Sequence, residues 1–220
     1  MLQSAWAAIM SPDALAGRAR MPPAEKEIAM TVMDEPVLPA STVTLPDAYG
    51  SAAKWFHWVT VVLLGIALPV GFVIDHVKDA DKMAFYAIHE SAGLTILFVA
   101  LARLAWRLRN PPKPLPEHVP PVLRKTAAAV HHTLYLLLIL QPILGFFATN
   151  AWGFPLRGET AYLGFIQLPK FMETDEGLAG VLQTIHTIGG WSILVLLVLH
   201  VGGVVFHQAI RRDGTLLRMV

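Results

Sequence analysis

Histidine is the residue type with the most evident chemistry in this sequence. The chain of 220 residues contains nine histidines and no cysteine. His57, His89, His186 and His200 lie within or at the ends of long apolar stretches, where ionisable side chains are costly and usually face the interior of a helix bundle. Imidazole binds metals and metal-containing cofactors. The sequence therefore predicts a cofactor or metal site that is built from histidine.

The spacing of these four histidines predicts two facing pairs. His186 and His200 share one apolar stretch and are 14 residues apart. In a helix this step returns to within about 40° of the same face, about 21 Å further along the axis. In an antiparallel bundle, His57 would lie at the level of His200, and His89 would lie at the level of His186.

Two facing histidines meet the ligand requirement of haem b better than that of zinc. Zinc requires three or four ligands in tetrahedral geometry, and neither level offers an evident third carboxylate or thiolate. Haem requires one axial ligand from each side and apolar walls, and two axial histidines leave no open position for oxygen, which indicates electron transfer. Because the chain has no cysteine, iron–sulfur clusters and covalently attached haem are excluded.

The same 14-residue step identifies further residues. From His89 it leads to Arg103, a cation on the inward face that suits a haem propionate or another anion, with extension to the lipid headgroups as the alternative. From His57 it leads to Gly71, where a macrocycle could approach the backbone, with close packing of two helices as the equal alternative. His131 and His207 are interpreted as interfacial anchors, with binding of a quinone or a propionate as the alternative for each.

Four apolar segments must position these residues. Residues 55–74, 86–108, 128–150 and 177–210 each meet the length of about 20 residues that a spanning helix needs. With 55% of residues in the class AVILMFWYC and 15% charged, the chain is more apolar than a soluble domain. The net charge of +1 predicts no nucleic-acid partner. The expected fold is an all-α, integral membrane four-helix bundle over residues 53–220.

Residues 1–52 are expected to form a flexible cytoplasmic leader. The first 50 residues contain six prolines and no sustained apolar period, and Met30 or Met33 is an alternative to Met1 as the start of the protein. Lys and Arg concentrate in the connection between the second and third segments and in the C-terminal tail. By the positive-inside rule, both termini are expected in the cytoplasm.

Taken together, several motifs of this sequence resemble the prokaryotic cytochrome b561 family over about residues 53–219. They are Trp55–Trp58, His89–Gly93 followed by Arg103, His131 and His132 with Tyr135, Pro142–Gly145, and His186 with His200. The resemblance implies two haem b groups, a cytoplasmic one between His57 and His200 and an outer one between His89 and His186. It also implies exchange of electrons with quinone.

Some members of this family resemble a superoxide oxidase that reduces ubiquinone. In this chain, Lys78, Lys82 or Lys170 could attract superoxide at the outer face. Each of these outer loops also carries three or more carboxylates, whose negative charge opposes the approach of an anionic substrate. This composition argues against superoxide as the substrate.

The leading hypothesis is a membrane diheme cytochrome b, an electron-transfer oxidoreductase that connects the quinone pool to an outer donor or acceptor, including superoxide. One alternative is a cytochrome b subunit of a dehydrogenase or hydrogenase complex. Another is a histidine-lined metal-ion transporter. The expected partners are quinone or quinol and the lipid bilayer, and the sequence does not identify a protein redox partner.

Overall fold

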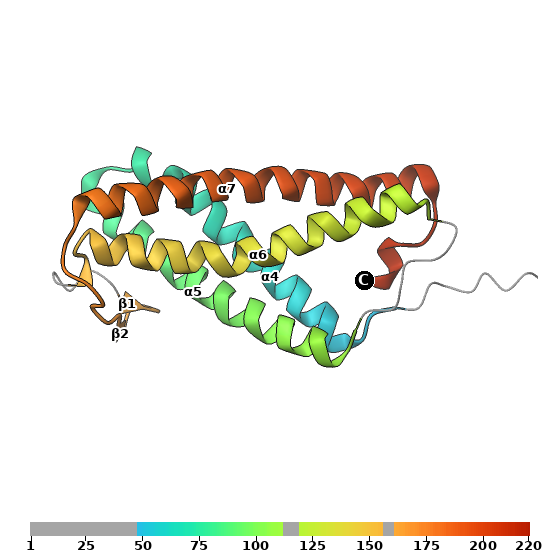
Figure 1. Cartoon of the computed structure of the whole chain (residues 1–220), viewed down its shortest axis with the longest axis horizontal. Helices are drawn as coiled ribbons and strands as arrows, with labels where there is room; N and C mark the ends of the chain where they lie inside the picture. Colours follow the sequence, from blue (N-terminus) through green and yellow to red (C-terminus); the bar gives the residue numbers. More distant parts are fainter. Residues whose placement is uncertain (1–47, 112–118, 156–160) are drawn as a thin grey trace, which may run out of the picture. The chain divides into compact units, whose positions relative to one another are not determined.

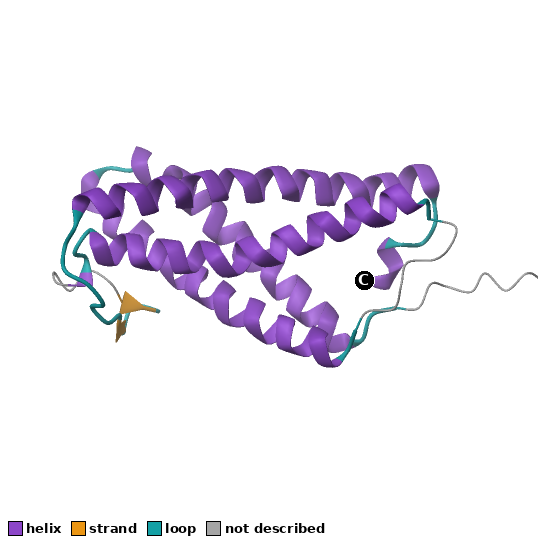
Figure 2. Cartoon of the chain, in the orientation of Figure 1, coloured by secondary structure: helices purple, strands orange, loops and turns teal. Residues whose placement is uncertain are grey.

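Four long helices make up most of the described protein. The computed structural model describes residues 48–111, 119–155 and 161–220. The helices are α4 (Ser51–Val73), α5 (Asp79–Arg109), α6 (Pro121–Ala151) and α7 (Glu176–Val205) (Figures 1 and 2). All four are long and apolar enough to cross a membrane, so the expectation of an all-α membrane bundle is confirmed. Most of the expected leader, residues 1–47, lies outside the described residues.

The helices run alternately in opposite directions (Figure 1). We call the end at which α4 and α6 begin the tail end, because residues 212–220 lie there, and the opposite end the hairpin end. The contacts between helices are most extensive in the pairs α4 with α5 and α6 with α7, followed by α5 with α6. The alternation brings residues from the start of one helix level with residues from the end of the next.

Short elements complete both ends. A 3₁₀ turn, η2 (Ile74–His76), separates α4 from α5. At the hairpin end, β1 (Ala161–Tyr162) pairs antiparallel with β2 (Ile166–Gln167). At the tail end, α7 continues as the π-helical turn η4 (Phe206–Arg211), and the 3₁₀ turn η5 (Leu216–Arg218) follows.

The β-hairpin is fixed to the flank of α5. The backbone N–H of Leu163 donates to Ser91 Oγ at 3.0 Å, and the hydroxyl groups of Thr95 and Tyr162 are 3.1 Å apart. Because Ser91 is two residues after His89, the hairpin covers α5 close to one of the predicted site residues.

The helices extend beyond the predicted apolar segments. Helix α5 begins at Asp79 instead of residue 86. Asp79 and Asp81 lie in its first turn, where negatively charged side chains stabilise a helix by interacting with its dipole. Helix α6 begins at Pro121 instead of residue 128, and proline suits the first position of a helix because its missing N–H has no partner there. The helices therefore project past the apolar layer, which hydropathy alone does not reveal.

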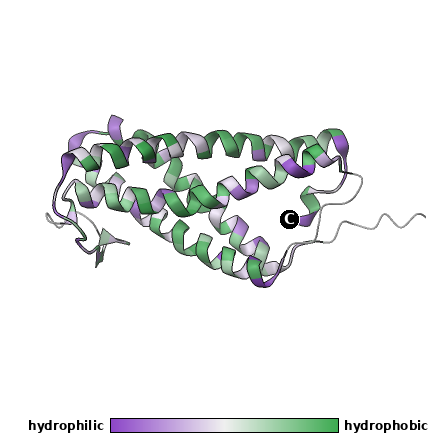
Figure 3. Ribbon diagram, viewed as in Figure 1, coloured by the Kyte–Doolittle hydropathy of each residue, from purple (hydrophilic) through white to green (hydrophobic). Residues whose placement is uncertain are grey.

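The core of the bundle is narrow and the lipid-facing surface is apolar. Small and branched residues from all four helices meet in it, namely Leu64, Ala67, Ala92, Ile96, Ala100, Leu134, Leu138 and Ile193. Large apolar side chains point outward, for example Val62 and Val198, and hydrophobic residues run along all four helices (Figure 3). This surface suits lipid rather than water, and we describe the chain as a multi-pass membrane protein.

Gly189 sets the close approach of α7 to α6, and this predicts the effect of a substitution. The buried side-chain amide of Gln141 occupies the position that a Cβ atom at Gly189 would need, whereas a Cβ at Gly190 would meet nothing within 4 Å. We expect Gly189→Ala to lower the thermal unfolding midpoint in detergent, with an overpacking cost of about 1–3 kcal/mol. Gly190→Ala is the matched control, and equal midpoints for the two variants would contradict this packing.

Candidate cofactor site

At the hairpin end, His89 of α5 faces His186 of α7. The centroids of the two imidazole rings are 5.9 Å apart and the rings are inclined by 84°. Nδ1 of His89 lies 2.8 Å from the carbonyl oxygen of Ala67, and Nδ1 of His186 lies 3.0 Å from that of Gln141. Because a carbonyl oxygen only accepts hydrogen bonds, each Nδ1 carries the proton. In both residues Nε2 is then left with the lone pair that binds a metal.

Two glycines make room for these imidazoles. A Cβ atom at Gly71 would lie 2.5 Å from Cε1 of His89, and a Cβ at Gly145 would lie 3.1 Å from Cε1 of His186. The sequence indicated Gly71 as a place where a macrocycle approaches the backbone. The structure instead places the ring of His89 there, so the glycine serves the imidazole directly.

At the tail end, His57 of α4 faces His200 of α7. Their ring centroids are 6.2 Å apart with an inclination of 60°. His131 of α6 lies nearer still, with its centroid 5.1 Å from that of His200, and its Nδ1 lies 2.6 Å from the carbonyl oxygen of Ala127. The sequence favours an interfacial anchor at His131, with quinone or propionate binding as the alternative, and the structure places its imidazole as a third one at this level.

The distances between ring centroids show which imidazole pairs could bind one metal ion between them. Two metal–nitrogen bonds of about 2.0 Å, plus about 1.1 Å from each nitrogen to its ring centre, set two trans imidazole centroids about 6.2 Å apart. The separations of 6.2 Å for His57 and His200 and of 5.9 Å for His89 and His186 fit this value. The separation of 5.1 Å for His131 and His200 is too short for the two rings to bind opposite sides of one ion.

The donor set favours a cofactor that brings its own ligands. Within residues 48–111, 119–155 and 161–220, no group of three His, Cys, Asp or Glu side chains is placed to hold a metal ion. A bare ion such as zinc needs three or four ligands, whereas haem iron needs from the protein only one ligand on each side of the ring. The residues present therefore fit haem.

Arg103 lies beside a cavity at the tail end. Its guanidinium carbon is 5.1 Å from the ring centroid of Tyr135, and that of Arg107 is 5.3 Å from the same ring. These three residues and His131 are among those that line a cavity of about 100 Å³. Two guanidinium groups next to one cavity suit a carboxylate or another anionic group.

The lysines at the hairpin end have acidic partners. Nζ of Lys82 is 3.1 Å from Asp79 Oδ1, and Nζ of Lys170 is 2.6 Å from Glu173 Oε1. Two of the three lysines that the sequence offered for superoxide are thus engaged by carboxylates, and their attraction for an anion is reduced.

Known proteins resemble this chain over nearly all of the described residues. The sequence model of a family described as prokaryotic cytochrome b561 matches residues 48–220. The chain is 29% identical over 183 residues to cytochrome b561 homolog 2 of Escherichia coli (strain K12), which covers 82% of this chain and 95% of that protein. It is 27% identical over 169 residues to the probable superoxide oxidase CybB of Yersinia pestis, which covers 74% of this chain and 90% of that protein.

The contact between Gly71 and His89 predicts a specific loss of cofactor. In Gly71→Ala the new methyl group would displace the imidazole of His89, because its Cβ would lie 2.5 Å from Cε1 of that ring. We expect the variant to bind less haem than the wild type by the pyridine haemochrome assay. Gly65→Ala on the same helix, where a Cβ meets nothing within 4 Å, should retain the wild-type content. An unchanged haem content in Gly71→Ala would show that the position of His89 is not needed.

Proposed function

The chain belongs to the prokaryotic cytochrome b561 family, and from this membership we propose that it is a membrane cytochrome with two haem b groups. In this proposal it passes single electrons between the quinone pool and a donor or acceptor at the opposite membrane face. The family implies haem b, and two haem groups are proposed because two separate imidazole pairs lie at the two ends of the bundle, with ring centroids 6.2 and 5.9 Å apart.

We propose that His57 with His200 would hold one haem group and that His89 with His186 would hold the other. The single observation that carries this assignment is the separation of the paired rings, 6.2 and 5.9 Å. Haem supplies the one-electron redox chemistry when it is bound. The 14-residue step along α7 sets the two levels about 21 Å apart along the axis, which corresponds to much of the apolar thickness of a bilayer.

The protein's own part is to orient the ligands, exclude water and balance charge. The carbonyl groups of Ala67 and Gln141 fix the tautomers of His89 and His186, a contact that also strengthens the imidazole as a ligand. Arg103 and Arg107 are proposed to neutralise the propionates of the tail-end haem, because both face the cavity beside His131.

The tail end is proposed to face the cytoplasm of a bacterium. Among the described residues, the tail end carries Lys54, Arg103, Arg107, Arg109, Arg124, Lys125, Arg211, Arg212 and Arg218, whereas the hairpin end carries Lys78, Lys82 and Lys170. The positive-inside rule then assigns the tail end to the cytoplasm. The hairpin end would face the outside of the inner membrane, and the chain termini would both be cytoplasmic.

The name of one relative suggests superoxide as the electron donor at the outer face. That relative is named a probable superoxide oxidase, and the reaction would reduce ubiquinone with electrons from superoxide. The ion pairs of Lys82 and Lys170 oppose electrostatic attraction of the superoxide anion. Superoxide therefore stays a proposal that the charge of the hairpin end does not favour.

The two alternatives to an independent cytochrome differ in their support. A cytochrome b subunit of a dehydrogenase or hydrogenase would use the same imidazole pairs, and it predicts copurification with a larger redox protein. A metal-ion transporter needs a ligand group for a bare ion, and the described part of the chain offers no such group of three.

Histidine variants test the ligand assignment. Because each haem would lose one of its two protein ligands, we expect His57→Ala and His200→Ala to remove the same haem, and His89→Ala and His186→Ala to remove the other. The readouts are the pyridine haemochrome content and the redox titration of the haem that remains. His131→Ala and the exposed His132→Ala are the controls and should keep both groups. If His131→Ala removes a haem that His57→Ala retains, the tail-end assignment is wrong.

Charge variants test the superoxide reaction. Asp79→Asn would release Lys82 from its ion pair, and we expect the rate of superoxide-dependent reduction of a soluble quinone to rise about two-fold or more at low ionic strength. The gain should vanish in about 0.5 M salt, where charges are screened. Asp81→Asn in the same helical turn makes the same change of charge without releasing Lys82. A wild type that reduces no quinone when superoxide is supplied would remove superoxide from the proposal.

A further inference from the structure

The four helices form two units that repeat one pattern. A step of 74 residues leads from α4 to α6 and joins residues of the same type at four positions. These pairs are His57 and His131, Leu64 and Leu138, Gly71 and Gly145, and Phe72 and Phe146. Leu64 and Leu138 both lie in the buried core, so the pattern holds in the packing as well as in the sequence.

A second step, of 97 residues, relates α5 to α7. The pairs of identical residues here are His89 and His186, Gly93 and Gly190, Ile96 and Ile193, and Leu97 and Leu194. Ile96 and Ile193 are each 3% exposed. The contacts between helices are also most extensive between α4 and α5 and between α6 and α7. Each of these two helix pairs is therefore one unit of an internal repeat.

The two units make the same hydrogen bond. In one unit Nδ1 of His89 donates to the carbonyl oxygen of Ala67 at 2.8 Å, and in the other Nδ1 of His186 donates to that of Gln141 at 3.0 Å. Ala67 and Gln141 are again 74 residues apart, and the glycine four residues after each lies against the imidazole ring. His89 and His186 are thus equivalent residues that face each other, as an approximate two-fold relation between the units requires.

The same relation gives a counterpart to each proposed ligand at the tail end. His131 is the counterpart of His57, and Arg103, which lies 97 residues before His200, is the counterpart of His200. The pair His57 and His200 therefore has an equivalent pair, His131 and Arg103, and both members of this second pair line the tail-end cavity. Nδ1 of His131 lies 2.6 Å from the carbonyl oxygen of Ala127, so Nε2 keeps the lone pair that a metal ligand needs.

Arg103 is the one of these four residues that cannot bind iron. A guanidinium group has five N–H donors and no acceptor, and it stays protonated. The position opposite His131 therefore holds a cation where the repeat would place an imidazole. The ring centroids of His131 and His200 are 5.1 Å apart, which is too short for the two rings to bind opposite sides of one ion. The guanidinium carbon of Arg103 lies instead 5.1 Å from the ring centroid of Tyr135.

We propose that Arg103 is a specificity-determining residue, which confines the tail-end haem to His57 and His200 by replacing the ligand that the repeat would supply opposite His131. The inference rests on the proposed function, which supplies haem b as the cofactor. Four imidazoles at this level would offer two crossed ligand pairs that share one space, and so two orientations of the haem. Arg103 leaves one orientation, and its charge stays next to the cavity, where it suits a propionate.

Moving the ligand to the second pair tests this proposal. The experiment uses the purified protein in detergent, with haem per chain from the pyridine haemochrome assay and low-spin signals from electron paramagnetic resonance. We expect His200→Ala to keep only the hairpin-end haem. Arg103→His added to His200→Ala should raise the haem content about two-fold and add a low-spin signal, because two imidazoles then ligate the iron. His131→Ala as a third change should remove this gain.

Two further variants keep the result decisive. Arg107→His in the His200→Ala background is the matched control, because Arg107 lies over the same Tyr135 ring but one helical turn further along α5, and it should restore no haem. Arg103→Met in that background supplies a thioether, which is also an axial ligand of haem, on an unbranched side chain. It should restore the haem even if Arg103→His does not fold.

The hairpin-end haem shows in each variant that the bundle has folded. A wild type without two low-spin haem groups overturns the proposed function and this proposal together. A wild type with two haem groups, in which neither Arg103→His nor Arg103→Met restores the haem lost in His200→Ala, overturns this proposal alone. A restored signal that survives His131→Ala also overturns it, because the new ligand would then not act with His131.

Discussion

The hydrogen bond from an imidazole Nδ1–H to a main-chain carbonyl is the interaction on which the hairpin-end site depends. Inside an apolar bundle, an imidazole without a partner is costly, and the carbonyl groups of Ala67 and Gln141 satisfy His89 and His186. Each bond leaves Nε2 directed elsewhere as a ligand. Gly71 and Gly145 provide the space that the two rings need. The antiparallel packing of α5 and α7 then brings the rings to 5.9 Å, which a metal can bridge.

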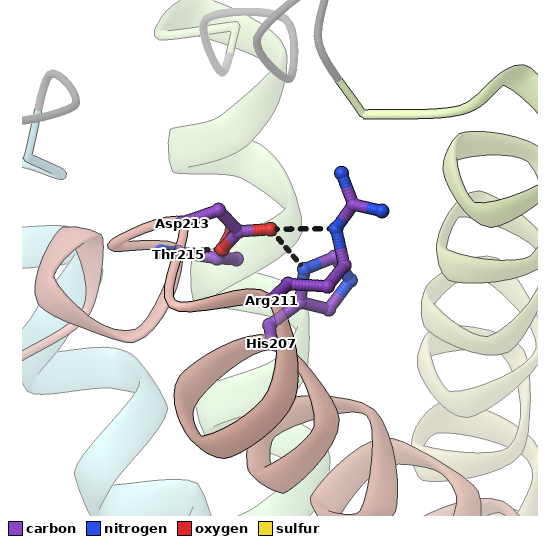
Figure 4. Close-up of polar contacts among 4 residues, drawn as sticks. All are labelled: His207, Arg211, Asp213 and Thr215. Atoms are coloured by element: carbon purple, nitrogen blue, oxygen red, sulfur yellow. Dashed lines mark hydrogen bonds and ion pairs between the residues drawn. The ribbon is translucent and has the colours of Figure 1, made fainter.

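The two ends of the bundle carry different groups. The tail end gathers a third imidazole at His131, two arginines over Tyr135, and the carboxylate–imidazole contact between Asp213 and His207 (Figure 4). The two arginines suit an anionic group. The hairpin end has ion-paired lysines and a small β-hairpin against α5.

Features that follow from the periodicity of the sequence could be predicted, whereas features that depend on tertiary contacts could not. The four spans follow from hydropathy and length, and the pairing of His57 with His200 follows from the 14-residue step and antiparallel packing. The extension of α5 from Asp79 to residue 85 contains three charged residues, Asp79, Asp81 and Lys82, which lower its hydropathy. The role of Gly71 depends on where the ring of another helix lies. The return of Asp213 to His207 requires a left-handed Arg212, which no periodicity indicates.

The central claim is that each imidazole pair holds one haem. The most direct measurement is the number of low-spin haem centres per chain, by electron paramagnetic resonance of the oxidised wild-type protein with the chain quantified by amino-acid analysis. The account predicts two distinct low-spin signals that together correspond to two haem groups per chain. A single signal with one haem per chain, or a high-spin signal from iron with an open position, would contradict it.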